Sequence, residues 1–176
     1  MKTVTEIKDR LAGAARSQAE QYAGGENRPL GGYATTMTVY VGTVAALATA
    51  VKASGKSLPD GLAAGDLVLC AASTHKLSRL IAKDPVTSPL RAPFTAYKGT
   101  QGPSELAEDV RGEGGQKTVG ELLTCPFCTG MWVATGFTAG LLLMPRTTRL
   151  AMGALTALTG ADILQFAHAW LEKVAG

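Results

Sequence analysis

Charged residues are absent from two long stretches of the chain, residues 33–51 and residues 125–144. Each stretch is close to the ~20 residues with which a helix crosses the ~30 Å hydrocarbon core of a bilayer. The chain as a whole is rich in Ala, Gly, Leu and Thr, and small residues allow helices to pack closely in lipid. These two segments are therefore the clearest predicted transmembrane helices.

Two further segments have membrane length but carry charges. Residues 150–170 contain Asp162. Residues 62–81 contain Asp66 and Arg79, which lie toward the two ends of the segment. An Asp, Lys or Arg at the centre of a helix costs roughly 2.5–3.5 kcal/mol on insertion into a bilayer. The pattern predicts an all-α polytopic membrane protein with four transmembrane helices, of which the second is marginal.

The alternative is a soluble helical bundle whose inner helices are apolar on all sides. The distribution of basic residues favours the membrane protein. Of the 17 Lys and Arg residues, five lie in the N-terminal arm, seven lie between Lys76 and Lys117, and one is Lys173, which leaves four for the opposite side. Basic residues concentrate in the cytoplasmic loops of membrane proteins. We therefore predict a multi-pass protein of the inner (cytoplasmic) membrane with both termini cytoplasmic.

Residues 1–30 form a cytoplasmic arm in this interpretation, ahead of a helical membrane domain of residues 31–176. Val4, Ile7 and Leu11 recur at helical spacing, which predicts a short amphipathic helix. Basic helices of this kind lie on anionic lipid, and a solvated helix docked on the protein has the same pattern. The arm contains no continuous apolar core, so we expect no signal peptide and a retained N-terminus.

The cytoplasmic connection, residues 84–124, is long for a compact bundle, and such connections are commonly functional or flexible. Prolines in its first ten residues argue against a regular helix, because each also restricts the residue before it. An extended strip along the membrane surface is expected there. Ser104 is expected to cap a short helix that ends at Val110. Thr118 and Glu121 have the spacing of a capping box, which predicts a second helix that approaches the membrane.

Three stretches taken together resemble one protein family. They are residues 75–84 (HKLSRLIAKD), residue 87 with residues 89–94 (PLRAPF), and residues 123–133 (LTCPFCTGMWV). The chain resembles the domain of unknown function 1360 family, small bacterial integral membrane proteins of which some are labelled sporulation proteins. The resemblance covers residues 33–170 and implies a multi-span helical membrane protein. It implies no activity, substrate or catalytic residue.

The third stretch places Cys125 and Cys128 at the start of a predicted membrane helix. Free amides and the dipole of a helix N-terminus favour a thiolate, as in dithiol redox sites. No strand leads into the pair, which excludes a thioredoxin-like fold. A structural zinc needs four ligands, for which His75, His168 or the same pair from a second subunit are the candidates. Alternatively, the two small side chains only allow the helix start to pack tightly.

An ionisable side chain inside a membrane helix marks a functional site by default. Asp162 lies well inside the fourth segment, and Arg79 or His75 of the second segment is its predicted partner. The alternative is a structural ion pair that fixes the register of two helices. Gly136 and Gly140 form a G-x-x-x-G pair in the third segment, a spacing that predicts close helix packing.

The sequence contains no P-loop, H-E-x-x-H or G-x-S-x-G motif, which argues against a familiar enzyme. The net charge of +3 gives no independent support for nucleic-acid binding. We predict a non-enzymatic interaction or assembly component that contacts the lipid bilayer and binds a second copy or another protein through residues 84–124. The alternatives are a thiol-redox or metal-binding (zinc) membrane protein, and a small carrier or pore former that depends on Asp162.

Overall fold

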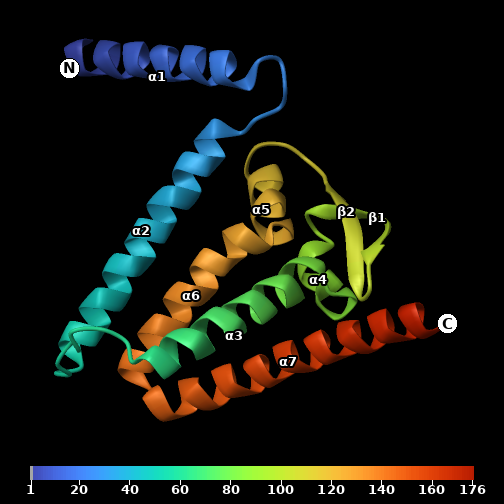
Figure 1. Ribbon diagram of the computed structural model, residues 1–176. Helices are drawn as coiled ribbons and strands as arrows, with labels where there is room; N and C mark the ends of the chain where they lie inside the picture. The colour runs from blue at the N-terminus through green and yellow to red at the C-terminus, as the bar shows by residue number, and fades with distance from the viewer. Residues whose placement is uncertain (1) are drawn as a thin grey trace.

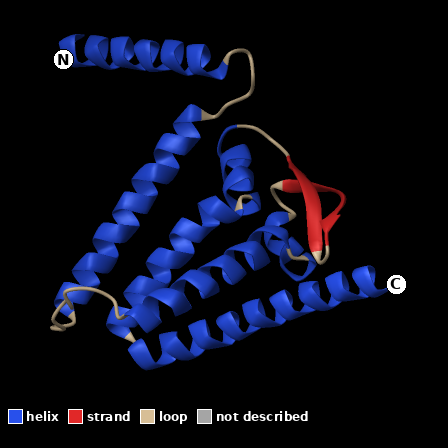
Figure 2. Ribbon diagram, viewed as in Figure 1, coloured by secondary structure: helices blue, strands red, loops and turns tan. Residues whose placement is uncertain are grey.

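The computed structural model describes residues 2–176 and is mostly helical. In chain order its elements are α1 (Lys2–Ala23), α2 (Leu30–Ala53), α3 (Ala64–Lys83), the 3-10 helix η1 (Pro85–Thr87), α4 (Ser88–Arg91), β1 (Thr95–Gly102), β2 (Glu105–Val110), α5 (Gly114–Thr124), α6 (Pro126–Leu143) and α7 (Pro145–Ala175). Within residues 2–176 the two strands form a single hairpin, which Figure 2 shows in red. The helical fold is confirmed, with a small sheet that the sequence did not predict.

The helices α2, α3, α6 and α7 converge at one end of the molecule and spread apart toward the other (Figure 1). The α2–α3 connection and the α6–α7 turn lie at the first end, called the closed end below. The hairpin, α4 and α5 lie at the second, the open end. α3 is the central helix, because it packs against both α6 and α7.

Three helices, α2, α6 and α7, are long and apolar enough to cross a membrane. They coincide with the first, third and fourth predicted segments to within a few residues at each end. The marginal second segment forms α3, a helix of 20 residues that does not meet the same criterion. The predicted number of four transmembrane helices is therefore not confirmed. The physical reason is the charge of α3, which includes Asp66, Lys76 and Arg79.

Side-chain contacts fix how α3 lies against α7. Near the closed end, the Arg149 guanidinium of α7 donates two hydrogen bonds of 2.7 Å to the Asp66 carboxylate of α3. Farther along, the Thr159 hydroxyl donates to the carbonyl oxygen of Ala72 at 3.2 Å. The partners in these and the neighbouring α3–α7 contacts are 83 to 87 positions apart. A nearly constant separation means that the two helices run parallel in one register.

The connection of residues 84–124, called the head below, is folded rather than extended. Pro85 is the first residue of η1, and Pro89 is the second residue of α4. Proline is tolerated in the first turn of a helix because the amides there have no helical acceptor. The prediction of an extended strip was wrong for this reason. The helix predicted to begin at Thr118, ahead of the third predicted membrane segment, is present as α5. It begins four residues earlier, at Gly114.

The short helix predicted from Ser104 to Val110 is also wrong. Those residues form the turn and strand β2, which pairs antiparallel with β1. Ser104 has a positive φ of 58° and follows Pro103 in the two-residue turn between the strands. A serine in that conformation cannot act as a helix N-cap, whose backbone lies in the extended region. The turn therefore directs the chain back along β1.

Candidate functional site

Arg91 of α4 is the centre of the head, and its side chain is 0% exposed. Its guanidinium donates hydrogen bonds to the Glu108 carboxylate of β2 (2.5 Å) and to the Thr87 hydroxyl (2.7 Å). It also donates to the carbonyl oxygens of Ile81 (2.7 Å) and Asp84 (3.0 Å) where α3 ends. The last carbonyls of a helix lack helical donors and carry partial negative charge. This Arg91 network therefore joins α3, η1, α4 and β2 into one unit.

Residues 85–93 around Arg91, called the strip below, have inverted polarity. The strip's polar side chains Thr87 and Arg91 turn inward and are hydrogen-bonded to α3, whereas its apolar side chains face outward. Val86 and Leu90 are 85% and 60% exposed and stand four positions apart in consecutive helical turns. The apolar face of the head is defined here as the exposed residues Pro85, Val86, Pro89, Leu90, Ala92 and Pro93. Contiguous exposed apolar patches mark interaction sites.

A polar groove of about 730 Å³ lies between α3, the hairpin turn and α7. Two ion pairs line it, Lys76 with Asp162 at 2.6 Å and Arg79 with Glu105. The sequence paired Asp162 with Arg79 or His75, and the structure gives it Lys76 instead. Arg79 is held by the hairpin, which the sequence interpretation lacked, and His75 is exposed. Since these charges have counter-ions, we interpret the groove as a contact region in which ion pairs hold α3 to α7 and to the hairpin.

Cys125 is the N-cap residue of α6. Its Sγ accepts a hydrogen bond of 3.2 Å from the backbone N–H of Cys128. Both thiols are free, with Cys125 half-buried and Cys128 exposed. The structure thus brings the two cysteines close together and gives Cys125 a capping role. A redox function of the pair stays a prediction.

No group of three or more His, Cys, Asp or Glu side chains among residues 2–176 could hold a metal ion. His75 lies at the polar groove. His168 is exposed near the end of α7, with its Nε2 3.3 Å from the Glu172 carboxylate. The histidines and the cysteine pair therefore do not form one ligand set within a chain. A zinc ion shared between the cysteine pairs of two subunits stays a prediction.

Gly136 and Gly140 of α6 have different surroundings. A Cβ added at Gly140 would lie 2.7 Å from the Thr148 hydroxyl oxygen, so this glycine allows the first turn of α7 to approach α6. A Cβ at Gly136 would meet no atom within 4 Å. Only Gly140 of this pair contributes to helix packing inside the chain.

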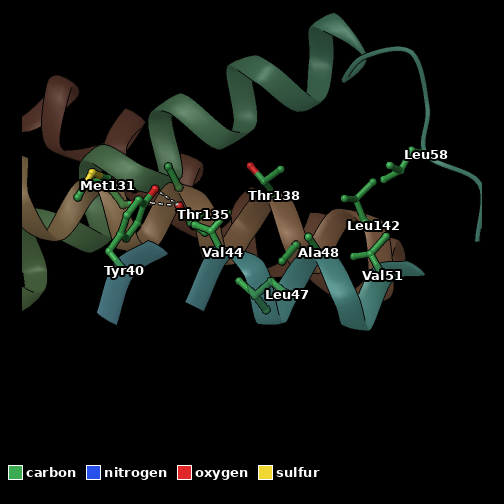
Figure 3. A pocket seen from close by; sticks show the side chains of 12 residues that line it. Tyr40, Val44, Leu47, Ala48, Val51, Leu58, Met131, Thr135, Thr138 and Leu142 are labelled. Atoms are coloured by element: carbon green, nitrogen blue, oxygen red, sulfur yellow. Dashed lines mark hydrogen bonds between the residues drawn. The ribbon is translucent and has the colours of Figure 1, made fainter. Parts of the chain in front are cut away.

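An apolar groove of about 480 Å³ lies between α2 and α6, and Figure 3 shows the side chains that line it. At one end the hydroxyls of Tyr40 and Thr135 share a hydrogen bond of 2.8 Å. The Tyr40 ring meets the Trp132 ring edge-on, with centroids 5.1 Å apart. The other lining residues are mainly aliphatic, among them Val44 and Leu142. The lining of the groove has no carboxylate, amine, imidazole or thiol. The groove therefore offers mainly apolar packing contacts.

The model of the family described as protein of unknown function (DUF1360) matches residues 68–168. The match includes most of α3, the whole head, α6 and most of α7. The chain belongs to this family. The resemblance carried by the three sequence stretches is thereby confirmed.

A curated relative is the sporulation protein YjcA of Bacillus subtilis (strain 168), which is 35% identical over 71 residues. The match covers 39% of this chain and 60% of the relative, so the chain spans about three fifths of that protein. No solved structure matches the chain. The comparisons therefore establish the family and specify no role for the chain.

The sequence interpretation missed Arg91 and Glu108 because their interaction depends on a hairpin that it did not predict. A signal for the hairpin is present in the sequence. Thr95 and Tyr97 lie two positions apart in the first strand, and both residue types favour strands. Pro103 with the following serine separates the two strands, as a turn requires.

Proposed function

We propose that this protein is a non-enzymatic membrane component that presents the apolar face of the head to a protein partner. The observation that supports the proposal most directly is the inverted polarity around Arg91. A flexible loop would bury such apolar side chains by rearranging. Here the Arg91 network holds the strip in one conformation. A fixed, exposed apolar surface has the property of a preorganised binding site, which loses little entropy on association.

The proposed setting is the cytoplasmic membrane, with the head and both termini in the cytoplasm. The supporting argument is the excess of basic residues on the side of the open end. Lys98 on β1 has a side chain that is 57% exposed and is suited to a topology test. In a background without other cysteines, Lys98→Cys is expected to react with a membrane-impermeant maleimide only after the cells are permeabilised. Reaction in intact cells would reverse the proposed orientation.

The name of the relative connects that protein with sporulation. We extend this setting to the present chain as part of the proposal. In a spore-forming host, deletion of the gene is then expected to reduce the yield of spores. A variant that is inserted in the membrane but lacks the apolar face is expected to have the same defect.

The decisive variant is Val86→Ser with Leu90→Ser, which changes two exposed side chains and leaves Arg91 in place. Val119→Ser is the matched control, because Val119 is an exposed valine of the head that lies on α5. We expect the double variant to accumulate in the membrane like the unaltered protein but to fail to restore the spore yield of the deletion strain. The control is expected to restore it. Full function of the double variant would contradict the proposal.

A photoreactive residue at position 90 identifies what covers the apolar face. We expect a protein adduct of one size in living cells, absent when the photoreactive residue replaces Glu113 at the exposed start of α5. The adduct should disappear when Val86 is changed to Ser in the same chain. Adducts with lipid alone would show that the face rests on the membrane surface and that the protein-partner proposal is wrong.

The alternative functions predict different effects of substitutions at other residues. If the protein were a thiol-redox or zinc-dependent protein, Cys125→Ser with Cys128→Ser would abolish function, whereas the proposal expects function to be retained. A carrier or pore former would lose function with Asp162→Asn. The proposal expects at most a reduced stability for that variant, because Asp162 pairs with Lys76.

A further inference from the structure

The N-terminal helix α1 has an apolar stripe that no part of the described chain covers. Ala14 and Ala15 lie on this stripe at helical spacing and are exposed. A solvated helix normally turns such a stripe toward a core. The stripe of α1 therefore requires another apolar surface. Its four large side chains are 56% to 67% exposed, and they belong to Val4, Ile7, Leu11 and Tyr22.

The charges of α1 are arranged around the stripe in a specific way. At 100° per residue, Lys8 and Arg10 lie at the two edges of the stripe. Basic side chains at the edge of an apolar face can bury their stems and still reach lipid phosphates. Acidic side chains on the far side are kept away from those phosphates. That far side carries Arg16 and the acidic residues of the helix, Glu6, Asp9 and Glu20.

The position of α1 in the chain keeps it near the membrane. Only residues 24–29 separate it from α2, the first candidate membrane helix. Six residues span at most about 20 Å when fully extended. Gly24 and Gly25 have positive φ values of 55° and 89°, and the chain turns there so that α1 does not continue the axis of α2 (Figure 1). The helix is thus tethered close to the bilayer surface in a direction different from that of the span.

We propose that α1 binds the surface of the lipid bilayer, with Val4, Ile7, Leu11 and Tyr22 inserted among the headgroups and acyl chains. A second copy of α1 is the competing partner for an apolar stripe. Between Leu11 and Tyr22 the stripe contains only alanines and the polar Gln18, whereas stable coiled coils repeat large apolar residues over several heptads. This inference does not depend on the proposed function of the head.

Spin labels on opposite sides of α1 test the inference in the full-length protein. Leu11→Cys labels the stripe, and Asp9→Cys labels the acidic side as the matched control. The background carries Cys70→Ala, Cys125→Ser and Cys128→Ser. Each labelled protein is reconstituted in vesicles of mixed phosphatidylethanolamine and phosphatidylglycerol. The accessibility of the label to oxygen, which enters lipid, is compared with its accessibility to a water-soluble nickel complex.

We expect the ratio of oxygen to nickel accessibility to be several-fold higher at position 11 than at position 9. Equal ratios at the two positions would overturn the inference, because both sides of the helix would then be in water. Protection of position 11 from both reagents, with spin–spin broadening between labels, would instead assign the stripe to a second copy. Protection from both without broadening would assign it to another part of the protein.

Discussion

Replacement of Arg91 by Met tests whether the Arg91 network holds the head together. Met removes the charge and every donor but keeps a side chain of similar length. The Glu108 carboxylate, which is 6% exposed, would lose its counter-ion. The carbonyl oxygens of Ile81 and Asp84 would lose the donors that they have in the structure. Removal of one partner from a buried ion pair costs about 3–5 kcal/mol.

Hydrogen–deuterium exchange of the purified protein in lipid nanodiscs measures this cost locally. At ~1.4 kcal/mol per factor of ten, the amides that join β1 and β2 should exchange about a hundred-fold faster or more. The amides of α2 are not joined to the network and should keep their rates. Arg111→Met is the matched control, since Arg111 is exposed and donates to a single carbonyl oxygen. It should change stability by about 0.5 kcal/mol or less.

A double variant separates the lost ion pair from a general loss of packing. Arg91→Met with Glu108→Leu removes both buried charges and replaces them with apolar side chains. Replacement of a whole buried ion pair by apolar residues is often neutral or stabilising. We therefore expect the hairpin amides of the double variant to exchange more slowly than those of Arg91→Met. The reasoning is refuted if Arg91→Met and Arg111→Met exchange alike, or if the second substitution worsens the first.

Two further predictions concern packing and capping, and thermal unfolding of the purified protein measures both. A Cβ at Gly120 would lie 2.6 Å from a methyl of Val110, so Gly120→Ala should cost about 1–3 kcal/mol. Gly115 lies in the same helix, and a Cβ there would meet no atom within 4 Å. Gly115→Ala should therefore be neutral or stabilising by up to about 1 kcal/mol. Cys125→Ala should cost about 1 kcal/mol through loss of the N-cap, whereas Cys125→Ser keeps an acceptor and should cost less. Equal costs within either pair would contradict the contacts described.

The long helices could be predicted from the sequence because their signal is local. An uncharged run of membrane length identifies α2 and α6 without any knowledge of their neighbours. The head depends on contacts between distant residues and could not be found in that way. The predicted helix from Ser104 to Val110 includes Glu105, so the sequence offers no strand partner for Arg79, and Arg79 or His75 is the predicted partner of Asp162. The structure shows that Arg79 binds Glu105, which leaves Lys76 as the partner of Asp162. One misassigned strand thus changed both partners.

The cysteine pair shows a second limit of sequence interpretation. The spacing of Cys125 and Cys128 is the same whether the pair caps a helix, exchanges electrons or binds a metal ion. The structure adds the hydrogen bond from the Cys128 amide to the Cys125 sulfur, which the capping interpretation explains directly. A sequence motif specifies which groups are near each other along the chain. Their role depends on the other groups that the fold brings to them.

The charges of α3 explain how the membrane helices and the head can act as one body. A helix with Asp66 and Lys76 is costly in lipid when it is isolated. In this protein it lies against α6 and α7, and α7 supplies a counter-ion for each of the two residues. The same helix ends at the carbonyl oxygens that Arg91 binds. Because closely packed helices transmit displacements, a shift of α3 together with α7 would displace the apolar face of the head, which is bound to the end of α3. A head on a flexible linker would not respond to such a shift.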